Sequence, residues 1–224
     1  MTDAELALRP PSGAAAIAAL GSSGDELGQV LALLRASGVE EPERLSVAAG
    51  DRRLLELHRA LTGRDVEVAV ACQACDTVNA AVLSPASVPP PTPRNAWLGR
   101  GGGLREPTYG DLLALPADPD AAERELLRRC TVGSPARPAD PGELDRVDDS
   151  LAGPILLVCV ECGELLEVAA DVELLALAGL QRHALEVEHE IHLLAGAYGW
   201  SLDAIEALPD ERRRRLAQLV ADRR

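Results

Sequence analysis

Two cysteine motifs constrain the fold of this chain more than any other feature. They are CQAC, which supplies Cys72 and Cys75, and CVEC, which supplies Cys159 and Cys162. Each pair has the C-x2-C spacing, follows an apolar segment typical of a strand and precedes another such segment. Two tight turns of this kind can point four thiolates at one ion in a tetrahedral arrangement. The sequence therefore predicts a zinc ribbon that holds one structural Zn²⁺.

The ribbon departs from the simple pattern in the distance between its halves. The gap between Cys75 and Cys159 is 83 residues, whereas about 15–20 are usual. We therefore expect a split ribbon over residues 64–83 and 154–170, with residues 84–153 forming an insertion whose flanks are rich in proline. Gly163 follows the second pair directly, where a turn needs an unusual backbone angle.

A pair of redox-active C-x2-C motifs is the competing interpretation. Redox motifs of the thioredoxin type open a helix, where the helix dipole lowers the thiol pKa. Strands are expected on both sides of each pair here, and this favours zinc. The fifth cysteine, Cys130, ends a predicted helix and is expected to be a small buried apolar residue.

The remainder of the chain is predicted to be largely helical, which gives an α+β fold class. A disordered lead-in is expected over residues 1–24. An N-terminal helical lobe follows over residues 25–63, because leucines recur there at helical spacing and glycines end the helices.

Within the insertion, two short helices are expected over residues 107–130, with Thr108 and Asp118 as N-caps. The proline- and glycine-rich residues 84–103 are expected to form a linker without regular structure. This gives a helical insertion with irregular flanks.

The C-terminal helical region, residues 171–224, is predicted to hold one long helix from Asp171 to about Tyr198 and two short helices. The long helix carries an apolar heptad seam, which is buried within the chain or joins two chains in an oligomer. The seam consists of Leu177, Leu180, Ala184, Val187, Ile191, Leu194 and Tyr198.

Three of the four histidines, His183, His189 and His192, lie on this same helix. A zinc protease helix needs two histidines at i and i+4, but His189 and His192 are three residues apart. Glu186 and His189 form one Glu-x-x-His motif, whereas a di-iron bundle needs two. The residues favour a helix with polar histidines on one face. The competing interpretation is a metalloenzyme that uses these three histidines.

Composition excludes some classes of partner. The net charge is −14, and an acidic surface repels nucleic-acid phosphates and anionic lipids. No apolar run is long enough for a membrane span. The acidic N-terminus does not have the pattern of a signal peptide. We therefore expect a cytoplasmic protein whose partner is neither a nucleic acid nor a membrane. In cytoplasmic proteins, cysteines bind metals more often than they form disulfides.

Several stretches together resemble a known family over roughly residues 25–224. They are AAGDRRLLELHRALTG, LREPTYGDLLAL, AAERELLRRC, the second cysteine pair and EIHLLAGAYGWSLDAIEALPDERRRRLAQLV. The family comprises baseplate proteins of contractile phage tails and phage-tail-like contractile injection systems, and it is related by name to the baseplate-hub assembly proteins of T-even phages. The closing motif is the most specific part: Glu190, Ile191, His192, Leu194, Ala195, Tyr198, Trp200, Ser201, Ile205, Leu208, Pro209 and the arginine run that starts at Arg212.

The resemblance implies a noncatalytic structural or assembly protein, with a chaperone-like role in the second case. Its partners would be baseplate or hub proteins, and it would lie free in the cytoplasm or within a phage-tail-like particle. An alternative is a zinc-ribbon module that binds nucleic acid or transcription machinery. The predicted ribbon strands carry no aromatic residue and only Arg64 at their edge, so they offer little for stacking or phosphate contacts.

Two groups of residues in the closing motif could dock a partner. His192, Tyr198 and Trp200 surround the corner after the long helix, and large aromatic side chains are favoured anchors. The competing interpretation is a corner packed by its largest side chains. The arginine run could bind an acidic partner surface or form a solvated helix face, and it comprises Arg212, Arg213, Arg214 and Arg215.

Overall fold

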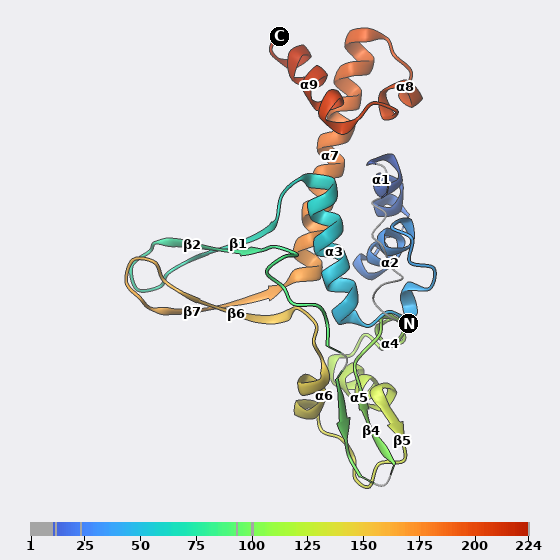
Figure 1. Cartoon of the computed structure of the whole chain (residues 1–224), viewed down its shortest axis with the longest axis vertical. Helices are drawn as coiled ribbons and strands as arrows, with labels where there is room; N and C mark the ends of the chain where they lie inside the picture. The colour runs from blue at the N-terminus through green and yellow to red at the C-terminus, as the bar shows by residue number, and fades with distance from the viewer. Residues whose placement is uncertain (1–10, 12, 23, 93, 100, 224) are drawn as a thin grey trace.

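The computed structural model describes residues 11, 13–22, 24–92, 94–99 and 101–223. A helical body lies at the centre of the molecule (Figure 1). Two β-hairpins project from one side of this body as an arm, the insertion lies at one end, and the C-terminal helices lie at the other end. Helices and strands therefore combine in one chain, in agreement with the predicted α+β class.

The helical body is built from α1 (Gly13–Gly21), α2 (Glu26–Ala36), α3 (Val47–Thr62) and the first half of α7 (Val172–Tyr198), with a short 3-10 turn, η2 (Pro42–Arg44). The expected glycine stop of α3 is present, and α2 starts at a side-chain cap that was not predicted. The Asp25 carboxylate accepts a hydrogen bond from the Gly28 N–H, and Gly63 ends α3 with φ +71°. Leucines fill the core, and the fully buried ones include Leu33, Leu34, Leu54, Leu57, Leu177 and Leu180.

The expectation of a disordered lead-in over residues 1–24 is wrong for its second half. Residues 13–21 form α1, which packs on α2 and α7. Ala16, Ala19 and Leu20 are buried in the core of the body. This segment consists only of glycine, alanine, isoleucine and leucine, and burial of one of its faces against the body stabilises the helix. Residues 1–10 lie outside the described residues.

The heptad seam of α7 is used within the chain. Leu177 and Leu180 belong to the core of the body, whereas Leu194 belongs to a second core formed with α8 (Leu202–Glu206) and α9 (Asp210–Ala221). The other buried members of this second core are Leu193, Ile205, Ala217 and Val220. Leu177, Leu180, Val187 and Leu194 are thus buried within the chain, whereas Tyr198 at the end of the seam is exposed. Pairing of two chains through the seam stays a prediction.

The insertion contains a sheet that the sequence did not predict. Strands β3 (Asn95–Trp97), β4 (Gly102–Arg105) and β5 (Thr131–Gly133) form an antiparallel sheet in that order. The prediction of an irregular linker over residues 84–103 is therefore wrong for residues 95–97 and 102–103, whereas residues 84–92 contain no helix or strand. Glycine permits the close pairing, since a Cβ at Gly103 would lie 2.2 Å from the Ala96 carbonyl oxygen.

Three helices complete the insertion: α4 (Tyr109–Leu112), α5 (Pro119–Cys130) and α6 (Pro141–Val147). The first two start at the predicted caps, Thr108 and Asp118, whereas α6 was not expected. The sheet and the helices enclose a separate small core, made of Leu98, Leu104, Cys130, Leu144 and Val147.

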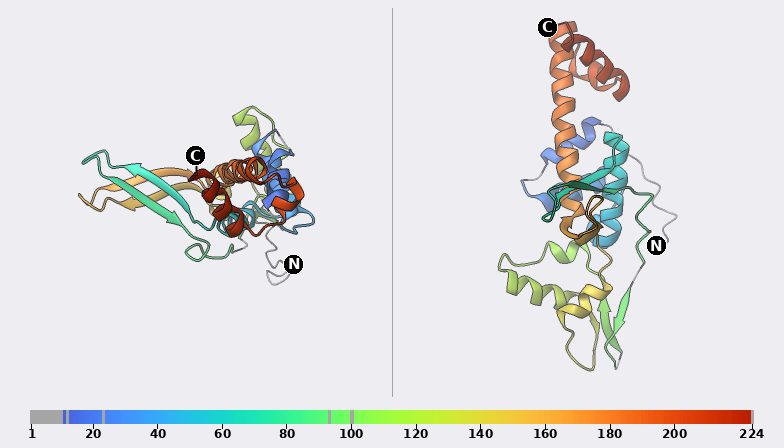
Figure 2. Two further views of the ribbon diagram at one scale, coloured as in Figure 1. Left: turned by 90° about the horizontal axis from the view of Figure 1, so that it is seen from above. Right: turned by 90° about the vertical axis from the view of Figure 1, so that its left-hand side faces the viewer.

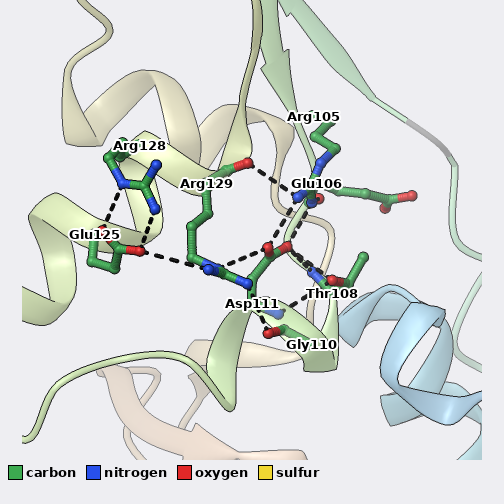
Figure 3. Close-up of polar contacts among 8 residues, drawn as sticks. All are labelled: Arg105, Glu106, Thr108, Gly110, Asp111, Glu125, Arg128 and Arg129. Carbon is green, nitrogen blue, oxygen red and sulfur yellow. Dashed lines mark hydrogen bonds and ion pairs between the residues drawn. The ribbon is translucent and has the colours of Figure 1, made fainter.

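One ion-pair network joins the parts of the insertion (Figure 3). The Asp111 carboxylate of α4 accepts hydrogen bonds from Arg105 of β4 at 2.6 and 3.0 Å, and Arg129 of α5 lies 3.3 Å away. Burial alone would raise the pKa of Asp111, but the hydrogen bonds from Arg105 and Thr108 lower it to about 2. The ion pairs of Asp111 with Arg105 and Arg129 thus link β4, α4 and α5.

The arm consists of two separate hairpins that lie side by side (Figures 1 and 2). Strand β1 (Val66–Ala71) pairs with β2 (Val78–Leu83), and β6 (Ala152–Val158) pairs with β7 (Leu165–Asp171). The predicted ribbon strands are therefore present, and the insertion leaves and re-enters between the two hairpins. None of the described helices is both long and apolar enough to cross a membrane.

Candidate metal centre

The turns of the two hairpins bring four cysteines together. The Sγ atoms of Cys72, Cys75, Cys159 and Cys162 all lie within 4.8 Å of one another. The Cys72–Cys162 and Cys75–Cys159 separations are 3.5 and 3.6 Å. A tetrahedron of sulfurs at about 2.3 Å from a central zinc ion has edges of about 3.8 Å. The cluster therefore has the size and the donor set for a metal ion such as zinc.

The two turns share one backbone design. In each turn, the first cysteine donates its N–H to the carbonyl five residues later, at 2.9 Å for Cys72 and 2.8 Å for Cys159. The residue four positions after that cysteine has a positive φ, which is +58° at Asp76 and +76° at Gly163. The expectation that Gly163 supplies an unusual backbone angle is confirmed.

Asn79 connects the two turns, and sequence reasoning missed it. Its Oδ1 accepts a hydrogen bond from the Val160 N–H at 3.0 Å, and its Nδ2 donates to Cys159 Sγ at 3.6 Å. The side chain is 5% exposed. The sequence did carry a signal, which is a polar residue at an inward position of the apolar strand TVNAAVL. A buried polar side chain normally has a hydrogen-bond partner.

The thiols influence each other's ionisation. Hydrogen bonds from the backbone N–H groups of Cys162 and Glu161 lower the pKa of Cys159 to about 6. The Glu164 backbone lowers the pKa of Cys162, but the neighbouring sulfurs of Cys75 and Cys72 outweigh it and raise that pKa to about 12. Without a cation the four sulfurs resist accumulating negative charge, so a divalent ion is what allows all four to be thiolates together.

The positions of the two cysteine pairs argue against the redox interpretation. Both pairs lie in hairpin turns and not at the start of a helix, which removes the dipole that activates redox motifs. Cys130 lies apart in the core of the insertion, where it is fully buried. Burial raises the pKa of its thiol to about 11, so it is a packing residue, as predicted.

The histidines of α7 do not form a second ligand cluster. Among the described residues, only the four cysteines bring together three or more ligand atoms of the kinds that bind metals. His183 Nδ1 lies 3.7 Å from Glu186, while His189 and His192 are exposed. His58 packs against Gly179, and its Nδ1 lies 3.0 Å from the Arg64 carbonyl oxygen. The helix with polar histidines is therefore the better description.

The corner after α7 exposes its aromatic pair. Tyr198 and Trp200 are 37% and 39% exposed, and their rings stack with centroids 4.9 Å apart. They are thus accessible to a partner, together with His192, and are not in the buried core of this region. Their role in docking stays a prediction.

The docking prediction is wrong for one member of the arginine run. Arg213 is 3% exposed and donates to Glu190 at 2.9 Å and to Asp210 at 2.7 Å. It shares an inward face with Ala217 and Val220, at i+4 and i+7, and this spacing was the signal that could have identified it. The remaining arginines, Arg212, Arg214 and Arg215, are exposed.

Comparisons of this chain with protein-family models, with curated proteins and with solved structures found no match.

Proposed function

We propose that the four cysteines bind one zinc ion, and that this ion is structural. Four thiolates complete a tetrahedral shell and leave no position for a substrate or an activated water. The sulfur separations fit this coordination, and the paired turns form one split zinc ribbon. When bound, the ion would neutralise the four thiolates and hold the two hairpin turns together.

We further propose that the protein is a noncatalytic structural or assembly component of the baseplate of a contractile tail or injection system. It would act free in the cytoplasm or within the particle, and its partners would be baseplate or hub proteins. The observation that carries this proposal is the resemblance of the closing motif. Its exposed Tyr198–Trp200 pair supports a docking role for the corner.

The nucleic-acid alternative has less support. The segments 66–83 and 152–171, which contain the hairpins, hold no arginine or lysine and no aromatic residue. Phosphate contacts and stacking platforms, which dominate binding to nucleic acids, are therefore missing from the arm.

Proteomics of purified contractile particles from the source cells, compared with the whole-cell lysate, tests the proposal. Enrichment in the particles near the stoichiometry of the baseplate proteins would identify a structural component. Abundance in the lysate together with absence from the particles would identify an assembly factor, provided that its deletion stops particle formation. Cells that make no such particle, or that assemble it normally without this protein, would contradict the proposal.

A further inference from the structure

The outer face of the β6–β7 hairpin is apolar and open to solvent. Leu156 and Val158 of β6 are 61% and 64% exposed, and Leu165 of β7 is 62% exposed. Val158 and Leu165 are direct partners across the two strands, so their side chains share one face. Val160, at the turn, is 83% exposed. Four large aliphatic side chains therefore extend along the outer half of the arm.

This exposure is not explained by the fold of the chain. An antiparallel sheet with one solvated face normally alternates apolar and polar residues. The inner positions of this hairpin already pack in the core of the arm, where Leu157 and Leu166 lie beside Cys72 and Cys159. The outer face has no packing role within the described chain, and contiguous exposed apolar surface marks interaction sites.

Charge limits what can cover this face. Every charged residue within the two hairpin segments, 66–83 and 152–171, is a carboxylate, and Glu167 lies directly across from Leu156 in the middle of the face. A second copy of the arm would bring the same carboxylates against each other, and phosphate-bearing lipids or nucleic acids would be repelled. The acidic residues of the hairpins are Glu67, Asp76, Glu161, Glu164, Glu167 and Asp171.

We propose that the outer face of the β6–β7 hairpin docks a different protein, through an apolar surface that carries arginine or lysine where it meets Glu167. The paired turns hold the end of this face in place, and such preorganisation lowers the entropic cost of binding. This surface is separate from the Tyr198–Trp200 corner, and its partner need not belong to a contractile particle.

Site-specific photocrosslinking in the source cells tests this docking. A photoreactive amino acid replaces Leu156 in one strain and Leu185 in another. Leu185 is the matched control, because it is a leucine of similar exposure, 66%, on α7. We expect the probe at position 156, and not at position 185, to join one other protein through a peptide that combines apolar and basic residues.

Charge reversal at the centre of the face completes the test. Glu167→Arg places a cation against the basic groups of the partner and should lower the crosslinking yield about tenfold or more, because like charges in an interface repel each other. Glu167→Gln should give an intermediate yield. Circular dichroism and metal content should both stay unchanged in these exposed-site variants, which would confirm that the arm is folded.

Four outcomes would overturn the proposal. They are crosslinking of position 156 to a second copy of this chain, equal yields at positions 156 and 185, a partner peptide without basic residues, and a yield that Glu167→Arg leaves unchanged.

Discussion

The helical body and the hairpin arm of this chain differ in how much apolar surface they bury. The body encloses a core of leucines that includes Leu33, Leu34, Leu54 and Leu57. The buried cluster of the arm contains Leu166 and two of the cysteines. Each hairpin is a two-stranded sheet, and such sheets are marginally stable alone. The comparison indicates that hydrophobic burial stabilises the body, whereas the arm, under the proposed function, depends on a metal ion held by its four cysteines.

Removal of a metal ligand should produce the largest difference in stability between the arm and the body. In Cys72→Ser we expect the zinc content to fall to near zero and the hairpins to lose protection from hydrogen exchange, while α2, α3 and α7 keep theirs. The effect is large because structural zinc contributes about 10–16 kcal/mol in isolated zinc-finger peptides. Metal analysis and hydrogen exchange with mass spectrometry check both halves of this prediction.

Cys130→Ala is the control for that variant, since Cys130 is buried in the insertion and lies outside the sulfur cluster. It should retain its zinc. If Cys72→Ser kept the zinc, or if α2, α3 and α7 lost protection together with the hairpins, the distinction between body and arm would be wrong.

A cavity in the core should destabilise the body and leave the metal site of the arm intact. Leu54 is fully buried in the core, and Leu54→Ala should lower the free energy of unfolding of the body by about 2–5 kcal/mol. Zinc content should stay unchanged under native conditions. Urea denaturation followed by circular dichroism measures the loss, and Leu185→Ala, at an exposed position of α7, should cost far less. Similar losses in the two variants would contradict the assigned core.

The body also contains a buried carboxyl group, Asp51, that should make its stability depend on pH. Oδ2 accepts a hydrogen bond from the Leu151 N–H at 2.6 Å, and Oδ1 has no hydrogen-bond partner among the described residues. Burial raises the pKa of Asp51 to about 7. The native state therefore binds a proton more tightly than the unfolded state, whose aspartate pKa is about 3.9.

The free energy of unfolding should consequently fall as pH rises from about 4 to about 7, because the native state holds more protons over that window. The loss would amount to a few kcal/mol, at about 1.4 kcal/mol for each unit of pKa shift. Asp51→Asn should remove this component, so the difference in unfolding free energy between wild type and variant should change across the window. A constant difference from pH 5 to pH 8 would show that Asp51 ionises normally.

Within the arm, substitutions in the two turns should change the zinc affinity by smaller amounts and in opposite directions. Gly163 has φ +76°, and a Cβ there would meet no atom within 4 Å, so Gly163→Ala adds only backbone strain. That strain is about 1–2 kcal/mol and should weaken zinc binding by roughly tenfold. Asp76→Gly, at φ +58°, should strengthen zinc binding slightly. Competition with a chelator measures both affinities, and a change in the same direction for both variants would contradict the shared turn design.

The elements that the sequence predicted are those with local signals. The predicted caps Thr108 and Asp118 mark helix starts, and each satisfies a backbone N–H in the structure. The cysteine spacing identified all four residues of the sulfur cluster, because C-x2-C between strands leaves few other geometries.

The features that were missed depend on contacts between distant segments. Strands β3, β4 and β5 are only three to four residues long, and β4 and β5 contain glycine, so they carry no period-two pattern. The burial of Arg213 depends on its pairing with Glu190, 23 residues away, and Asn79 meets Val160 across the two hairpins. Such pairings are set by tertiary packing, which overrides local propensity.

The most direct test of the central claim is metal analysis of the purified wild-type protein, combined with hydrogen exchange before and after chelation. The account predicts about one zinc per chain, and chelation should deprotect residues 66–83 and 152–171 while the core of α3 and α7 stays protected. A folded protein that contains no metal and whose hairpins are protected from exchange would contradict it.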